Sequence, residues 1–151
     1  MSKYQATVRW SRNNARFLDG HYSRKHIWEF DGGAEIIASA SPLIVPIPYS
    51  DPQAVDPEEA LIAAASSCHM LWFLNIAQQE GFAVDKYHDE ASGIMTSVGI
   101  KKPWISKINL FPRTTWAGAK PKPHVLRLLH ENAHDNCYIA NSLKAEIEIH
   151  L

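Results

Sequence analysis

Alternating apolar and polar side chains mark the first part of the chain. From Tyr4 to Trp10 every second residue is apolar, which is the period of a half-buried strand. Residues 22–30 and 34–40 are two further strand-like runs, and the turn sequence Asp31-Gly32-Gly33 between them predicts a hairpin. These runs together predict a small N-terminal antiparallel sheet.

A long apolar run in the middle of the chain predicts one central helix that ends at Gly81. Asp56 is a candidate N-cap, Pro57 suits the first helical position, and Glu59 stands three residues after the cap, as in a capping box. Gly81 supplies a C-terminal stop. Apolar residues occupy every face of the run, so we expect protein to surround this helix on most sides.

The other segments complete an alternating order of elements. Five prolines between residues 41 and 57 exclude a regular element there, and residues 82–97 and 105–116 have strand character and predict a second sheet region. Residues 143–151 alternate clearly and predict a last strand. We therefore expect an α+β fold in a single domain that spans residues 1–151.

A second helix is expected between the last two strand regions. Pro121-Lys122-Pro123 opens it, and its predicted end lies immediately before Cys137. Helical spacing places four apolar residues on one face, namely Val125, Leu128, Leu129 and Ala133.

Composition narrows the classes of function. The 151 residues carry a net charge of -1, which gives no electrostatic footprint for nucleic acid or for an anionic membrane. The N-terminus lacks the apolar core of a signal peptide, so a cytoplasmic protein is expected. The central apolar run falls short of the ~20 residues of a membrane span and contains His69 and Asn75, so we reject a membrane interpretation.

Two cysteines stand in places where chemistry is possible: Cys68 in the middle of the central helix and Cys137 directly after the second helix. In a reducing compartment such a pair indicates redox chemistry, metal binding or no chemistry at all, rather than a structural disulfide. From the helix alone, Cys68 is better explained as a small buried hydrophobe than as a reactive thiol.

The segments around both cysteines carry a family resemblance. Residues 57–68, from Pro57 to Cys68, and residues 133–142, which contain Cys137, closely resemble the two cysteine motifs of the OsmC/Ohr proteins, the osmotically inducible and organic-hydroperoxide-resistance family. The resemblance extends over nearly the whole chain and implies an α+β fold in which two chains intertwine as a homodimer. The motifs depart from the family at two positions: Tyr138 stands where the family commonly has proline, and His69 follows the first cysteine, as in a less studied subgroup.

The same resemblance implies an activity, a thiol peroxidase that reduces organic hydroperoxides to alcohols. Cys68 would be the peroxidatic thiol, Cys137 the resolving thiol, and Glu58 part of the site. In the family the site arginine lies on the N-terminal sheet, before a short run that ends in a proline. Aligning that proline with Pro42 places the arginine at Arg24. The resemblance implies no bound cofactor, and an external dithiol reductant would reopen the disulfide.

Elementary chemistry agrees with a role for Arg24. A thiolate attacks a peroxide, and a free cysteine with a pKa of ~8.5 is only a few per cent ionised at neutral pH. Cys68 lies in mid-helix, away from the helix N-terminus, so a nearby cation is required, and an arginine is always charged. The simpler interpretations are that Arg24 is a solvated strand residue and that Glu58 is a first-turn acid favoured by the helix dipole.

Two other classes of function remain open from the sequence. One is a zinc site formed by Cys68, His69, His134 and Cys137, although adjacent helical residues project about 100° apart and Cys68 and His69 would hardly reach one ion. The other is a small-ligand binding protein that keeps this fold without peroxidase activity.

The central helix also predicts how the site is assembled. Glu58 and Cys68 lie ten residues apart, which separates them by ~15 Å along one helix. Either Arg24 spans the gap, or Glu58 comes from the helix of a partner chain packed across a two-fold axis. The apolar character of the helix favours the second arrangement and a homodimer.

Overall fold

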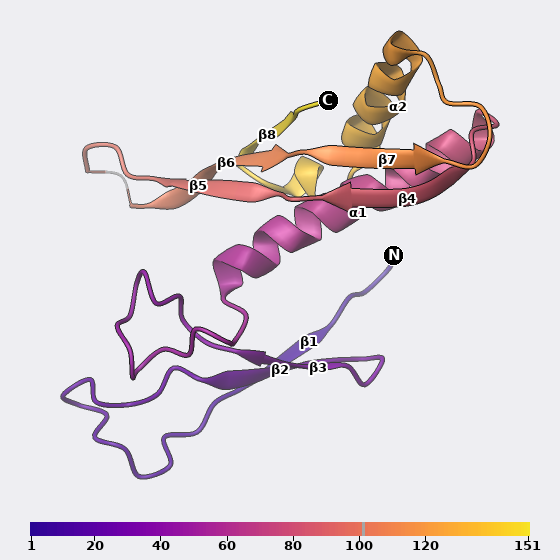
Figure 1. Cartoon of the computed structure of the whole chain (residues 1–151). Coiled ribbons are helices and arrows are strands. Elements are labelled where there is room, and N and C mark those ends of the chain that lie inside the picture. The colour runs from indigo at the N-terminus through magenta and orange to yellow at the C-terminus, as the bar shows by residue number, and fades with distance from the viewer. Residues whose placement is uncertain (101) are drawn as a thin grey trace. The chain divides into compact units, whose positions relative to one another are not determined.

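Two compact units, Met1–Ala60 and Leu61–Leu151, make up the chain in the computed structural model, which describes residues 1–100 and 102–151. The first unit contains a three-stranded sheet, and the second contains most of the helical structure and two further sheets (Figure 1). The alternation of strands and helices confirms the predicted α+β class.

The sheet of the first unit is antiparallel, with strand order β1-β2-β3. Its strands are β1 (Ala6–Arg9), β2 (His26–Phe30) and β3 (Glu35–Ala38). Ala6 pairs with Phe30, and His26 pairs with Ala38. The predicted hairpin is confirmed, and its turn depends on Gly33, whose φ of 84° suits glycine better than any other residue.

The proline-rich segment contains turns but no helix or strand, as predicted. It is tied to the end of β3 by backbone hydrogen bonds, because Val55 donates to the carbonyl of Ile37 at 3.1 Å and Ser39 donates to the carbonyl of Val55 at 3.0 Å. Ser39 is fully buried there. The segment is therefore an ordered connector that leads directly to the central helix.

The central helix is α1 (Pro57–Gln79), and both of its predicted ends are confirmed. Asp56 Oδ1 accepts the backbone N–H of Glu59 at 2.8 Å, and Glu59 Oε2 reaches back to the N–H of Asp56 at 3.4 Å, which is a capping box. At the other end Gly81 has a φ of 80°, and the next residue, Phe82, donates to the carbonyl of Ala77 at 2.9 Å.

The expected burial of α1 on most sides is wrong for the single chain. Its buried residues are Ala65, His69, Phe73 and Ala77, which are spaced by four and form one stripe. Leu71, on another face, is 61% exposed. One chain has too few elements to cover every face of a 23-residue helix, so an apolar surface is left over.

By length and composition α1 could also cross a membrane, and it is the one such helix among residues 1–100 and 102–151. Its buried stripe, however, packs into a hydrophobic core in which Phe73 and Ala77 contact Leu129 and Ala133. The buried stripe of α1 is therefore part of the protein core.

The strands of the second unit divide into two sheets, where the sequence predicted one sheet region. β4 (Val84–Asp89) pairs with β7 (Pro112–Trp116) in a two-stranded antiparallel sheet. β5 (Ser92–Thr96), β6 (Trp104–Leu110) and β8 (Glu146–Ile149) form the other sheet, in the order β5-β6-β8. β6 and β8 are parallel, which is possible because a helical crossover joins them.

That crossover contains α2 (Pro123–Asn136) and a short 3-10 helix, η1 (Ala140–Ser142). Proline opens α2, and Cys137 is its C-cap, as predicted. The predicted apolar face needs one correction, since Leu128 is 53% exposed while His130 is buried. The core side of α2 is centred on Leu129 and Ala133, and this rotation brings His130 inward and turns Leu128 outward.

Candidate redox site

The two cysteines are neighbours in the second unit. Cys68 lies on α1 and is half-buried, whereas Cys137 caps α2 and is 1% exposed. Both are free thiols. The Cys137 backbone N–H donates to the carbonyl of His134 at 3.1 Å, and its Sγ accepts the N–H of Ala140 at 3.3 Å. These bonds hold the second thiol at the junction between α2 and η1.

The environment of Cys137 distinguishes the two thiols. Burial and a hydrogen bond with the Cys68 thiol raise the pKa of Cys137 to about 11. Cys137 therefore remains protonated at neutral pH and is a poor initial nucleophile. Of the two, the more accessible Cys68 is the better placed to react first with a molecule from solution.

The residue that follows Cys137 adds a contact to α1. The ring of Tyr138 meets that of Trp72 edge to face, with centroids 5.6 Å apart. Trp72 stands four residues after Cys68 and so lies on the same side of α1. Tyr138 is 67% exposed, which makes this pair an outer border of the cysteine region.

Glu58 lies in the first turn of α1, where acids are favoured by the helix dipole. It is half-buried, and its Oε2 is inaccessible to solvent and has no hydrogen-bond partner among the described residues. A buried carboxylate oxygen without a partner is costly. The first-turn interpretation explains the position of Glu58 but not this unpaired oxygen, which is suited to accept a hydrogen bond from a ligand or another chain.

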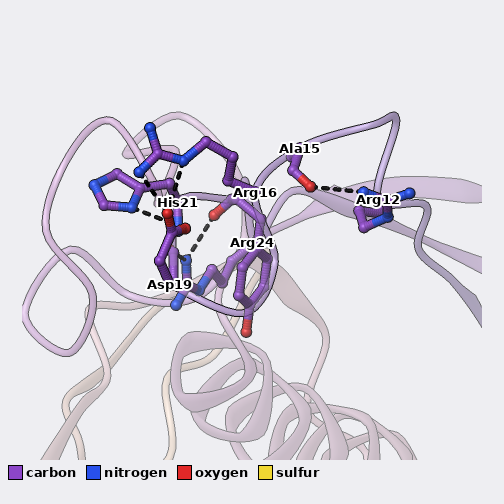
Figure 2. Close-up of polar contacts among 8 residues, drawn as sticks. Arg12, Ala15, Arg16, Asp19, His21 and Arg24 are labelled. Atoms are coloured by element: carbon purple, nitrogen blue, oxygen red, sulfur yellow. Dashed lines mark hydrogen bonds and ion pairs between the residues drawn. The ribbon is translucent and has the colours of Figure 1, made fainter.

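Arg24 lies in the first unit, just before β2, and its side chain is fixed by neighbours in its own segment (Figure 2). Its Nη1 donates to the carbonyls of Gly20 at 2.8 Å and Tyr22 at 2.6 Å. The guanidinium carbon lies 3.7 Å from the centre of the Tyr22 ring and 5.9 Å from that of Tyr49. The charge is thus placed by backbone carbonyls and aromatic faces.

No carboxylate neutralises Arg24 among the described residues. Asp19, which belongs to the same loop, is instead paired with Arg16 and His21, at 2.7 Å to Arg16 Nε and 3.0 Å to His21 Nδ1 (Figure 2). Arg24 and Glu58 form no ion pair with each other within the described parts of the chain. Arg24 therefore keeps its charge and its remaining donors for another group.

Of the four predicted site residues, then, the structure brings Cys68 and Cys137 together within one unit. Arg24 and Glu58 both belong to the first unit and lack an opposite charge. Each has the property its predicted role requires: a placed cation and an unpaired buried acid oxygen.

A buried pair of histidines beside the cysteines was not predicted from the sequence. His69 Nε2 and His130 Nδ1 are 3.0 Å apart, and the two side chains are 1% and 2% exposed. Burial lowers the pKa of His69 to about 4 and that of His130 to about 3, so both are neutral at pH 7. The helical spacing of His69 and His130 among apolar residues could have indicated that both face the core. Their pairing depends on tertiary structure and could not be predicted from the sequence.

The zinc alternative has no support in this geometry. Among residues 1–100 and 102–151, no three histidine, cysteine or acidic side chains gather closely enough to hold a metal ion. His69 directs Nε2 to His130, while its neighbour Cys68 meets Cys137.

Comparisons with known proteins agree with this fold. The sequence model of the OsmC-like protein family matches residues 50–151. An OsmC-like protein of unknown function from Vibrio cholerae O1 biovar eltor is 46% identical, with 99% of each chain covered and a TM-score of 0.96. No match is found among curated proteins.

More distant structures share the fold alone. An organic hydroperoxide resistance protein from Elizabethkingia anophelis, with thiocyanate bound, is 14% identical, covers 99% of this chain and 93% of its own, and has a TM-score of 0.72. An organic hydroperoxide resistance protein OsmC from Legionella pneumophila is 14% identical, with coverages of 99% and 94% and a TM-score of 0.65.

These features define an α+β protein with a long central helix and a pair of free thiols between its two helices. The family match covers more than half of the chain, and the Vibrio relative matches nearly all of it. The chain belongs to the OsmC-like protein family.

Proposed function

We propose that this protein is a cysteine-based peroxidase that reduces organic hydroperoxides to alcohols in the cytoplasm. The observation that carries the proposal is the proximity of two free thiols of unequal character, the accessible Cys68 and the buried, protonated Cys137. Membership of the OsmC-like family, and fold relatives named as organic hydroperoxide resistance proteins, support the choice of substrate.

The first step uses the Cys68 thiolate. It attacks one oxygen of the peroxide, the O–O bond breaks, and the leaving alkoxide takes up a proton to become an alcohol. Cys68 is left as a sulfenic acid, two electrons more oxidised. Arg24 is proposed to stabilise the thiolate and the departing oxygen, with Glu58 orienting the guanidinium through its unpaired oxygen.

The second step uses the neighbouring thiol. Cys137 loses its proton and attacks the Cys68 sulfur, so that an S–S bond forms and water leaves. The buried position of Cys137, in contact with Cys68, suits this role because the attack needs no large movement. An external dithiol then reduces the disulfide by thiol–disulfide exchange, and no bound cofactor is required.

The active protein is proposed to be a homodimer. Glu58 and Cys68 belong to the same helix, and ten residues separate them by ~15 Å along its axis. A partner's α1 packed across a two-fold axis would bring one chain's Glu58 to the other chain's Cys68. The apolar surface of α1 that includes the exposed Leu71 suits such a contact.

The proposal is tested by stopped-flow measurement of thiol loss with tert-butyl hydroperoxide and with hydrogen peroxide. We expect faster oxidation by the organic hydroperoxide, loss of turnover in Cys68→Ser, and a single turnover followed by a stall in Cys137→Ser. Full peroxidase activity of Cys68→Ser would overturn the assignment. Binding of the hydroperoxide without oxidation of Cys68 would indicate a ligand-binding protein instead.

A further inference from the structure

We propose that the buried His69–His130 hydrogen bond positions the resolving thiol: it fixes α2 on α1 so that Cys137 stays in contact with Cys68. The proposal rests on the proposed function for its significance, because it assigns the two histidines to the disulfide-forming step. Neither histidine is proposed to touch the substrate.

The positions of the histidines relative to the cysteines are the first support. His69 directly follows Cys68 on α1. His130 precedes Cys137 by seven residues, which is about two helical turns, so both lie on the same side of α2. A restraint between His69 and His130 therefore acts on the same segments of α1 and α2 that carry the thiols.

The geometry of the pair is the second support. The two imidazole planes differ by 4°, and the joined nitrogens are 3.0 Å apart, as expected for a hydrogen bond in a common plane. His130 also stacks on Phe73, with centroids 4.1 Å apart and an interplanar angle of 18°. Phe73 is one turn beyond His69 on the buried stripe of α1, so α2 is held at two successive turns.

A hydrogen bond fixes the two helices more narrowly than apolar contact does. The core between α1 and α2 otherwise consists of side chains such as Ala77, Leu129 and Ala133, which tolerate small shifts of one helix along the other. A shift that separates His69 from His130 leaves buried nitrogens without partners. The bond thereby selects one axial position and one rotation of α2. Because Cys137 is the C-cap of α2, the same bond determines where this thiol lies.

The unpartnered nitrogen of His69 indicates which residue donates. Nδ1 of His69 is buried and has no hydrogen-bond partner among the described residues. If Nε2 were the acceptor, the neutral ring would carry its proton on this isolated Nδ1, as a buried donor without an acceptor. We therefore assign the proton to His69 Nε2, which donates to His130 Nδ1.

This assignment specifies the conservative substitutions. The amide nitrogen of glutamine reaches about as far as Nε2 of histidine, and the amide oxygen of asparagine about as far as Nδ1. His69→Gln and His130→Asn should therefore keep the bond, whereas His69→Leu and His130→Leu remove it. His124→Leu is a matched control, because His124 is exposed near the start of α2.

The test measures the equilibrium constant for disulfide formation between Cys68 and Cys137 in a buffer of reduced and oxidised dithiothreitol at pH 7. It needs no peroxide, so it is independent of peroxidase activity. We expect each leucine variant to lower the constant about tenfold, equivalent to about 30 mV. His69→Gln, His130→Asn and His124→Leu should stay within about twofold of wild type.

The double variant His69→Leu/His130→Leu separates positioning from stability. It leaves no unpaired buried nitrogen, so its unfolding free energy should recover relative to the single variants. Its disulfide constant should stay low, because no directional bond is restored. It also provides the comparison if a single leucine variant does not fold.

Three results would overturn the proposal. One is an unchanged disulfide constant in the leucine variants, and another is its recovery together with stability in the double variant. The third is failure of the wild-type protein to form the disulfide at all, which would also overturn the resolving step of the proposed function. If only thiol loss with hydroperoxide fails, the peroxidase assignment falls while the positioning role of the pair stands.

Discussion

Ser66 on α1 donates a hydrogen bond of 2.5 Å to Oδ2 of Asp89, the last residue of β4. Oδ1 of the same carboxylate accepts the backbone N–H of Phe111 at 2.7 Å, between β6 and β7. One half-buried side chain thus ties the central helix to both sheets of the second unit. Ser66 stands two residues before Cys68, so this junction also supports the cysteine region.

Asp89→Ala should lower the free energy of unfolding by about 2–3 kcal/mol, because a hydroxyl and a backbone N–H both lose a charged acceptor. Chemical denaturation followed by circular dichroism measures the change. Asp85→Ala is the control, since Asp85 lies on the same strand and is exposed, and it should change stability by less than about 0.5 kcal/mol. Equal losses in the two variants would contradict the junction.

The titration of Cys137 should depend on Cys68. Burial and the Cys68 contact raise the pKa of Cys137 to about 11, so Cys68→Ala should lower that pKa by removing one of the two causes. Thiolate absorbance near 240 nm, followed against pH in Cys68→Ala and Cys137→Ala, measures each thiol alone. An unchanged or higher pKa of Cys137 in Cys68→Ala would show that the thiols do not interact.

Acid should destabilise the protein through the histidine pair. Burial lowers the pKa of His69 to about 4 and that of His130 to about 3, with the positive charge of His134 adding to the effect on His69 and the carboxylate of Asp89 opposing it. Below the unfolded pKa of ~6.5 the unfolded chain binds more protons than the folded one. Stability therefore decreases as the pH is lowered, by up to about 1.4 kcal/mol per pH unit for each histidine.

This loss should begin near pH 6.5 and continue until the folded histidines themselves take up protons, near pH 4 for His69 and pH 3 for His130. Urea unfolding at a series of pH values measures the slope. The double variant His69→Gln/His130→Asn lacks both titrating rings and should show a flatter profile between pH 6.5 and 5. A slope equal to that of wild type would assign the acid sensitivity to other groups.

The end of α1 should depend on a glycine at position 81. Gly81 has a φ of 80°, and a Cβ there would meet no atom within 4 Å, so Gly81→Ala should cost only the strain of the backbone, about 1 kcal/mol. Gly32→Ala is the matched control, because its site is equally open and its φ is not positive. Thermal unfolding compares the two, and equal melting temperatures would contradict the role of Gly81.

The sequence predicted well those features that depend on neighbours along the chain. The capping box of Asp56 and Glu59, the stop at Gly81 and the end of α2 before Cys137 are local, and all are confirmed. It was wrong about Leu128, because helical spacing alone does not fix which of two adjacent faces meets the core. The division of the second sheet region and the pairing of His69 with His130 depend on long-range contacts, which periodicity does not encode.

The candidate site also contains some features that could be predicted from the sequence and others that could not. The pairing of Cys68 with Cys137 was proposed from motif resemblance, and the structure places the two thiols near enough for Cys68 to affect the pKa of Cys137. The roles of Arg24 and Glu58 stay predictions, since each depends on a partner that local sequence does not determine. The homodimer was predicted from the apolar character of the central helix and from the resemblance, and it stays a prediction; the exposed Leu71 on α1 is consistent with a covering partner.

The proposed dimer leads to a prediction about mixed chains. In α1, Glu58 and Cys68 belong to one straight element and lie ~15 Å apart along its axis, so one chain cannot bring both to a single reacting atom by itself. If each site takes Glu58 from one chain and Cys68 from the other, two variants with complementary defects should restore activity. We therefore expect Glu58→Ala and Cys68→Ser to be nearly inactive alone and to regain activity when unfolded together and refolded as a mixture.

The expected gain follows from the pairing statistics. Half of the dimers in an equal mixture are heterodimers, and each of these has one site with an intact Glu58 and an intact Cys68, so about a quarter of all sites should be active. Leu71→Glu is a useful comparison, because a charge on the exposed face of α1 should weaken association without entering the buried stripe. Sedimentation of a fully active monomer, or a mixture no more active than its two components, would show that each chain completes its own site.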